Sequence, residues 1–493
     1  MVTPDITQIS LTDLSSPLHP DNLVPITRKS WPPENGSFVY PTHSARQPVI
    51  LTETFVSQWP ARNKWTSLQY LNKHLPSKIN VARNTDRYFV HHDASPQFPL
   101  AETNDPTFER DVIPRKQFWE RITEDRSHRI NPSVLQRANA QMTEAQQKLR
   151  LERTKQNEAF PGLKKSTADD GKLYYFNSMV PDLNAPTLLS DVPSSYRTLV
   201  VDDFAPSPDG TPSPVPRPPG SNPDRGEIKL WIGSQGVVAN LHYDATQNFY
   251  LQIRGRKRFL LISPEHWENV HCHPRLHPSD RQSMTHFLKA ETDAGWSELK
   301  SKFPLIQNVK GHVIEAFLDE GEVLYIPPFW FHNVESLDAA TVSVNVWSSS
   351  REEDLYMFGV LQNAAPYLND PTINIKWTPA ITAMATQVYL ALLVKAVEGI
   401  DDNFLEDVVV NAQYGFMGIK VDGEKQPLHK AVADRFKPML EPHVQRMAKE
   451  AFAHMPLGIR KSLLAGYAEA LANHVLGGKY RDVPKYLRNA YLN

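Results

Sequence analysis

Cysteine is almost absent from this chain, with one residue, Cys272, among 493. A single cysteine excludes an internal disulfide framework and a cysteine-rich zinc site, and such scarcity is typical of proteins kept in a reducing compartment. We therefore expect a cytoplasmic location, a nuclear location, or both.

Excess charge and long apolar runs are also lacking. The chain has 53 basic and 55 acidic residues, a formal charge of −2, so it has no general attraction to nucleic acid or to an anionic membrane. The N-terminus is polar and lacks the apolar core of a signal peptide. The most apolar stretch, around residues 388–394, is too short to span a bilayer. These absences disfavour a nucleic-acid partner and a membrane partner.

Composition divides the chain into four regions, with a β core in the third. Short β-branched and aromatic runs between turn residues indicate strands in that core. The regions are an extended N-terminal arm (1–45), an α/β lead-in that ends in a charged helix over 133–158 (46–165), the β core (166–350) and a helical C-terminal domain (351–493).

The β core contains a proline-rich insert at residues 205–225. Eight prolines fall between positions 206 and 223, and proline cannot donate to a sheet ladder. This composition favours a surface loop, and a ligand for a proline-recognition domain is the alternative.

The C-terminal region contains a helix that is apolar on nearly all sides. Thr378 fits its N-cap, Pro379 its first turn and Gly399 the position after its end. Such a helix must be covered on more than one face. We expect a homodimer through the C-terminal helices, while coverage by residues 400–493 of the same chain is the alternative.

The first motif with metal-binding character is LHYDATQNFYLQIRGRKRFLLI, residues 241–262. On a strand, His242 and Asp244 project from the same face. One imidazole and one carboxylate are two of the three ligands in the facial triad of non-heme iron(II) oxygenases. A lone His-x-Asp pair is weak evidence by itself.

The second motif, GEVLYIPPFWFHNVES at residues 321–336, supplies His332 after a break forced by two prolines. The next run, TVSVNVW, places three valines on one face. Its other face carries Thr341, Ser343, Asn345 and Trp347 and is expected to line a pocket. His332 alone would suit a core histidine, but together these segments predict an iron site. Lys257, after the Arg254-Gly255 turn, is a candidate for the far carboxylate of a 2-oxo acid.

These stretches, together with HPSDRQS at 277–283, resemble the JmjC-domain proteins of the cupin superfamily. Within that family they are most similar to the asparaginyl hydroxylases typified by factor inhibiting HIF. The resemblance covers roughly residues 47–350 and implies a mainly β core, a double-stranded β-helix or jelly roll, with flanking helices and an all-α C-terminal region, α+β overall.

The resemblance also implies roles for individual residues. The implied iron ligands are His242, Asp244 and His332, with Lys257 and Tyr174 on the distal carboxylate of 2-oxoglutarate. Further implied positions are Asn248, Asn345 and Trp347 in the cosubstrate pocket, and Arg281 and Gln282 on the substrate. Two residues depart from the pattern: Ala239 replaces a frequent threonine, and Phe176 stands where the asparaginyl hydroxylase has a glutamine.

The expected function is an Fe(II)- and 2-oxoglutarate-dependent dioxygenase that hydroxylates a side chain of a protein or peptide. A JmjC lysine demethylase, an RNA-modifying oxygenase and a non-catalytic JmjC-like binding module are the alternatives.

Overall fold

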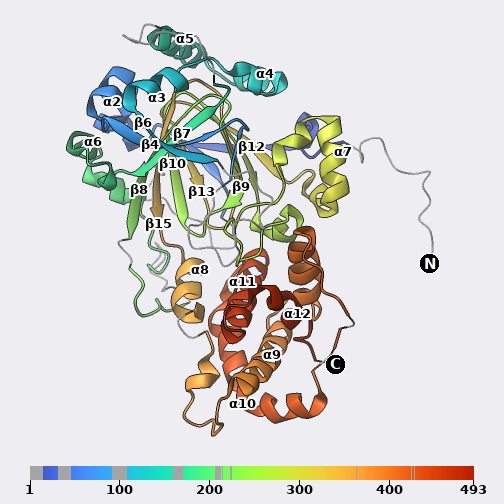
Figure 1. Ribbon diagram of the computed structural model, residues 1–493. Helices are drawn as coiled ribbons and strands as arrows, with labels where there is room; N and C mark the ends of the chain where they lie inside the picture. The colour runs from blue at the N-terminus through green and yellow to red at the C-terminus, as the bar shows by residue number, and fades with distance from the viewer. Residues whose placement is uncertain are drawn as a thin grey trace.

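The computed structural model describes residues 15–31, 46–90, 108–158, 170–205, 213, 215–222, 225–361, 364–423, 425–426 and 428–492. Two mixed β-sheets form the upper half of the molecule in Figure 1, and the C-terminal helices gather below them. The α+β cupin-type fold expected from the sequence is confirmed.

The first sheet has six strands in the spatial order β1-β12-β11-β14-β9-β5. Their bounds, in that order, are Leu23–Pro25, Val313–Leu318, Lys257–Ile262, Phe331–Ser336, Val238–Tyr243 and Tyr88–Phe89. The second sheet has nine strands in the order β2-β3-β13-β10-β15-β8-β7-β4-β6. These span Thr27–Ser30, Val49–Thr52, Val323–Ile326, Gln247–Arg254, Thr341–Ser348, Gly226–Gly233, Leu173–Met179, Lys78–Asn84 and Glu109–Pro114.

The N-terminal arm contributes to both sheets. Strand β1 pairs in parallel with β12, and β2, two residues later, pairs in parallel with β3 on the other sheet. Ile26, between them, packs against the apolar cluster that fills the space between the sheets. The described part of the arm therefore links the two sheets along one edge.

Side-chain alternation divides the second sheet into two chemically different faces. Val342, Val344 and Val346 of β15 pack into an outer core with aromatic residues such as Trp65 and Trp119. The alternate residues point between the two sheets, as period-two geometry requires. The expected polar inner face of β15 is therefore present.

Helices cover the outer faces of both sheets. The lead-in and barrel helices are α1 (Pro60–Lys64), α2 (Leu68–His74), α3 (Arg115–Ile122), α4 (Pro132–Ala140), α5 (Glu144–Glu158), α6 (Pro186–Ser190) and α7 (Asp293–Lys302). The C-terminal ones are α8 (Arg351–Asp354), α9 (Pro379–Ala396), α10 (Lys430–Glu450), α11 (Leu457–Val475) and α12 (Val483–Arg488), with π-helical turns at Leu355–Leu361 and Leu405–Tyr414.

The charged helix predicted over 133–158 is two helices. The Thr143 amide donates to Gln146 Oε1 at 2.8 Å, and the Gln146 amide donates to Thr143 Oγ1 at 3.3 Å. This reciprocal pair is a capping box, so it starts a new helix after Ala140. Of the proline-rich insert, residues 205, 213, 215–222 and 225 are described, and Val215 is buried.

Helix α9 is covered within its own chain. It packs against α10 and α11, and its residues from Ala385 to Val394, with the exception of Gln387, are buried. Among the described residues it is the one helix long and apolar enough to cross a membrane, but half of that window lies inside the protein. The alternative in which the same chain covers the helix is the one observed. The homodimer stays a prediction, but a second subunit is not needed to cover α9.

The C-terminal helices join the half of the molecule that contains the two sheets through a close backbone contact at Gly458. A Cβ placed there would lie 1.9 Å from the Pro264 carbonyl oxygen and 2.7 Å from Glu265 Cα. Only glycine allows helix α11 to approach the Pro264–Val270 turn (η10) this closely.

We therefore expect Gly458→Ala to lower the free energy of unfolding by about 1–3 kcal/mol, the usual cost of overpacking a close contact. Thermal and urea unfolding would measure the change. Gly415→Ala is the matched control, because the Cβ would lie 3.7 Å from its nearest neighbour, Val410 O. Equal stability of the two variants would contradict the close contact.

Candidate metal centre

Two histidines from neighbouring strands form the base of the candidate centre. His242 on β9 lies directly across from His332 on β14, and their ring centroids are 4.2 Å apart. Asp244 follows the end of β9, with Oδ2 at 3.8 Å from His332 Nε2. One ligand atom from each of the three residues lies within 4.8 Å of the others, and no other such metal-binding group occurs in the described chain.

Backbone carbonyls orient both imidazole rings. His242 Nδ1 lies 2.6 Å from the Asn240 carbonyl oxygen, and His332 Nδ1 lies 3.0 Å from that of Trp330. A carbonyl oxygen only accepts hydrogen bonds, so each Nδ1 carries the proton and each Nε2 has a free lone pair. This tautomer is the one that a metal ion needs from both rings.

The electrostatics also favour a metal ion. Burial, together with His332, holds the pKa of His242 at about 3, so its ring is neutral at physiological pH. Burial alone would raise the pKa of Asp244, but the neighbouring His332, His242 and Arg281 outweigh it and lower that pKa. Two imidazoles and one carboxylate are a donor set that suits iron(II) with open coordination positions.

A β-bulge aligns the two histidines. The register between β14 and β9 changes between His332 and Val334, where one extra residue is accommodated on β9. Val334 and Ala239 pair on one side of the bulge, and both belong to the cluster between the sheets. Without the extra residue, a slip of one position would turn His242 away from the pocket.

Lys257 lies deeper between the sheets, on the same face of the first sheet. It pairs with Ser336 of β14. Ser336 is four residues from His332, so the two positions are roughly 13 Å apart along the strand. Its Nζ donates to Tyr250 Oη at 2.6 Å and lies 5.6 Å from the Tyr175 ring centroid. Burial lowers its pKa to about 7.

The surroundings of Lys257 fit an anionic cosubstrate. Its side chain is 1% exposed, and among the described residues it forms no ion pair with a carboxylate. A buried ammonium without a counter-ion is costly, and native proteins pair such charges. The distal carboxylate of 2-oxoglutarate would supply the missing partner.

Tyr174 is not part of this pocket. Its hydroxyl donates to Asp170 Oδ2 at 2.6 Å, and its ring packs in the outer core. The neighbouring Tyr175 points inward to Lys257. The sequence-based placement is therefore off by one residue, and on a strand one residue changes the face.

Two residues departed from the family pattern, Phe176 in place of a glutamine and Ala239 in place of a threonine. The one-residue shift on β7 accounts for Phe176, and Tyr250 compensates for Ala239. Phe176 packs on the outer face against Phe118, while Asn177 occupies the inner position opposite Trp231. Ala239 has no hydroxyl, but Tyr250 places one at Lys257. Neither departure leaves the pocket without the kind of polar group that the pattern requires.

The remaining predicted residues lie around the triad. Asn345 Nδ2 donates to Asn248 Oδ1 at 2.9 Å, and both side chains are buried on the inner face beside Trp347. Arg281 Nη1 lies 3.7 Å from Asp244 Oδ1, and Gln282 forms a β-bridge with His242. The structure thus brings all the predicted pocket residues together except Tyr174.

A cavity of about 310 Å³ opens beside Asp244. Its walls are made by the start of β8, the end of β15, the loop after β9 and helix α8. The lining residues are Arg225, Glu227, Asp244, Ala245, Thr246, Arg281, Trp347, Ser348, Ser349 and Glu353. Of the three candidate ligands, Asp244 lines this cavity, and we infer that the cavity is the entrance to the metal centre.

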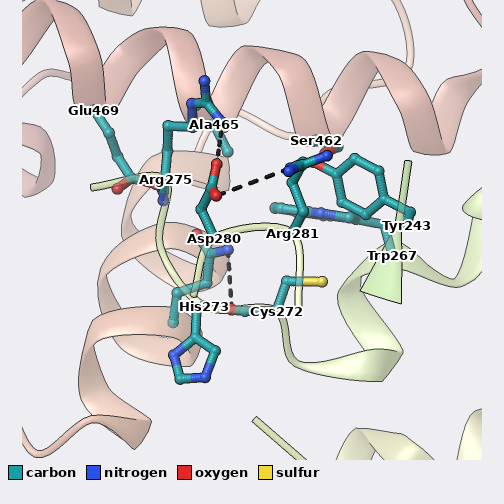
Figure 2. Close-up of a pocket in the computed structure, with 12 residues that line it drawn as sticks. Tyr243, Trp267, Cys272, His273, Arg275, Asp280, Arg281, Ser462, Ala465 and Glu469 are labelled. Carbon is teal, nitrogen blue, oxygen red and sulfur yellow. Dashed lines mark hydrogen bonds and ion pairs between the residues drawn. The ribbon is translucent and has the colours of Figure 1, made fainter. Parts of the chain in front are cut away.

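The C-terminal helices support the metal-binding strand from outside, a feature that the sequence analysis missed. Tyr243, between two ligands, shares a hydrogen bond of 2.9 Å with Ser462 of α11. Figure 2 shows this contact region, where Arg275 bonds to Asp280 and Asp280 pairs with Arg281. In the sequence, the charged residues of the segment 275–281 were the one feature that could have indicated this contact.

A second support also starts from α11. Glu469 accepts hydrogen bonds from the Arg275 amide at 3.2 Å and from the Tyr414 hydroxyl at 2.9 Å. Burial raises the pKa of Glu469 to about 7. The segment that carries Arg281 is therefore fixed by the C-terminal helices.

Comparisons with known proteins agree with this geometry. Residues 38–354 match the model of a family described as a cupin-like domain. JmjC domain-containing protein D of Dictyostelium discoideum is 40% identical over 114 residues, 23% of each chain. HSPB1-associated protein 1 of Rattus norvegicus is 36% identical over 130 residues, 26% of this chain and 25% of the relative.

A third relative, Jumonji C domain-containing protein 5 of Drosophila melanogaster, is 34% identical over 121 residues, 24% of this chain and 27% of the relative. The aligned parts span about a quarter of the length of each of these relatives. The family model covers more than half of the chain, and the architecture and the metal-binding group fit it. The chain belongs to the family of cupin-like domains and is similar over a quarter of its length to JmjC domain-containing proteins.

Proposed function

We propose that this chain is an Fe(II)- and 2-oxoglutarate-dependent dioxygenase that hydroxylates a side chain of a protein or peptide. The observation that carries the proposal is that the triad of His242, Asp244 and His332 lies on the same face of the first sheet as the buried Lys257, which has no counter-ion among the described residues. The triad would hold the iron, and Lys257 with Tyr250 would hold the distal carboxylate of 2-oxoglutarate.

The bound iron and cosubstrate would supply the oxidising chemistry. One oxygen atom of O2 enters the substrate as a hydroxyl group, the other enters succinate, and CO2 is released. The residues of the chain supply placement and a water-poor site. Asn248 and Asn345 form a buried amide pair beside the triad, and Trp347 borders the entrance.

A protein substrate is favoured over the alternatives by several features. One group of relatives, the HSPB1-associated proteins, is named for association with another protein. The formal charge of −2 disfavours RNA. A non-catalytic module would not need the three ligands and the buried lysine together. The proposal includes the similarity to asparaginyl hydroxylases. In support, the inner position of β7 is occupied by the amide residue Asn177, where those enzymes have a glutamine.

The proposal predicts slow succinate formation when Fe(II), O2 and 2-oxoglutarate are supplied without a primary substrate. Asp244→Ala should abolish it, because two neutral imidazoles bind a dication much more weakly than a site with a carboxylate. Succinate and bound iron would be quantified together by mass spectrometry. Asp434→Ala, on the exposed side of α10, is the control that should retain both. Succinate formation at the wild-type rate in Asp244→Ala would refute the ligand assignment.

Lys257 predicts a pH dependence of cosubstrate binding. Its pKa of about 7 in the free protein lies below the ordinary 10.5, so above pH 7 the free side chain loses its proton. Binding a dianion then requires uptake of that proton, and the affinity for 2-oxoglutarate should fall roughly 25-fold between pH 6.5 and pH 8.5. Calorimetry on the Mn(II)-loaded protein would measure the fall.

Lys257→Met provides the comparison. It should bind 2-oxoglutarate at least roughly a hundredfold more weakly, as expected for the loss of one partner of a buried ion pair, and should lack the pH slope. Its affinity for Mn(II) should stay close to that of the wild type, because Lys257 is not a ligand. The same cosubstrate affinity in both proteins would exclude this role.

A further inference from the structure

The inner face of β8 carries a lysine that the proposed reaction does not yet use. Ile228, Leu230 and Ile232 face the outer core, so Lys229 and Trp231 face the space between the sheets. Lys229 lies opposite Asn345 on β15. It is therefore a direct neighbour of the proposed cosubstrate pocket.

Lys229 is half-buried and lies against two aromatic rings. Its Nζ is 4.5 Å from the Trp231 ring centroid and 5.5 Å from that of Trp347. The two indoles meet edge to face, with centroids 6.3 Å apart, and Tyr175 stacks on Trp231 at 5.4 Å. Among the described residues, Lys229 forms no hydrogen bond or ion pair, so cation–π contacts are its main interactions.

The two tryptophans bring further unused donors. Trp231 Nε1 and Trp347 Nε1 are both buried and have no acceptor within the described chain. An unmet buried N–H costs about 1–3 kcal/mol, so native proteins leave few of them. Three donors therefore lie in one cluster, one of them charged, and a ligand with several acceptor atoms would satisfy them.

The charged groups around Lys229 also favour an anionic ligand. Burial lowers the pKa of Lys229, Arg110 adds to this effect, and Asp244 and Glu227 oppose it. Bound iron would take up the charge of Asp244, and Glu227 is already paired with Arg225 at 3.3 Å.

Two further charged side chains line the entrance. Arg281 lies beside Asp244, and Glu353 has one buried oxygen without a partner. Burial raises the pKa of Glu353, which favours its neutral form. The balance of charge around Lys229 is therefore positive once the metal is bound.

We propose that Lys229, Trp231 and Trp347 form an anion-binding subsite for the primary substrate, which selects an acidic side chain of a protein or peptide. This inference rests on the proposed oxygenase function. The carboxylates of 2-oxoglutarate are already served by Lys257 at one end and by the metal and the Asn248–Asn345 pair at the other. A cationic side chain such as arginine or methyl-lysine would be repelled by Lys229.

The test uses full-length protein loaded with Mn(II) and N-oxalylglycine, an inert analogue of 2-oxoglutarate. It is exposed to three peptide pools with a central Asp, Asn or Arg and otherwise identical random flanks, and bound peptides are quantified by mass spectrometry. The wild type should retain the Asp pool at least roughly tenfold over the Arg pool, the size of one charge-assisted contact. Preference for the Arg pool would overturn the proposal.

Three variants separate charge from shape. Lys229→Glu should reverse the preference between the Asp and Arg pools, while Lys148→Glu, an exposed charge reversal on α5, should leave it unchanged. Trp231→Phe keeps a ring but removes the N–H, and should weaken retention of the Asp pool severalfold. An unchanged preference in Lys229→Glu would overturn the subsite.

Calorimetry distinguishes this failure from failure of the proposed function. Lys229→Met should bind N-oxalylglycine within about threefold of the wild-type affinity, as a contact to the primary substrate alone implies. A loss of more than roughly tenfold would assign Lys229 to the cosubstrate and overturn the subsite. Wild-type protein that binds neither Mn(II) nor N-oxalylglycine would instead refute the oxygenase proposal itself.

Discussion

The cross-strand pair of His242 and His332 is the contact around which the rest of the site is arranged. Both rings must face the space between the sheets, and β9 achieves this by accommodating an extra residue opposite β14. Backbone carbonyls two residues before each histidine then fix its tautomer. Asp244 completes the group from the position directly after the end of β9. The metal site is therefore a property of strand register as much as of residue type.

Buried polar groups between the sheets are divided into two classes. Some are satisfied by each other, as Asn248 is by Asn345. Others lack a complementary partner within the described chain: Lys257 has no carboxylate, and Trp231 and Trp347 have no acceptors. Because an unmet buried group reduces stability, its retention indicates a ligand. The unmet groups include acceptors such as Asn345 Oδ1, but the lysine and the two indoles are donors, which fits the proposed acidic cosubstrate and acidic substrate.

The C-terminal helices take part in this arrangement rather than forming a separate body. Gly458 allows α11 to approach the barrel backbone, Ser462 bonds to the tyrosine between two ligands, and Glu469 fixes the segment that carries Arg281. A change in the packing of α11 would therefore reach the metal site through a few short contacts. Helix α9, in contrast, is enclosed by α10 and α11 and serves the core of this half.

The sequence alone predicted the candidate ligand group, the family resemblance and the polar face of β15, because these depend on residue type and on spacing along one or two strands. Tertiary structure decided that Tyr175 rather than Tyr174 faces Lys257, since neighbouring strand residues point to opposite faces and local sequence does not say which face is buried where. It also decided that α9 is covered within one chain. Both outcomes depend on contacts between residues far apart in the sequence, and spacing along the chain does not encode such contacts.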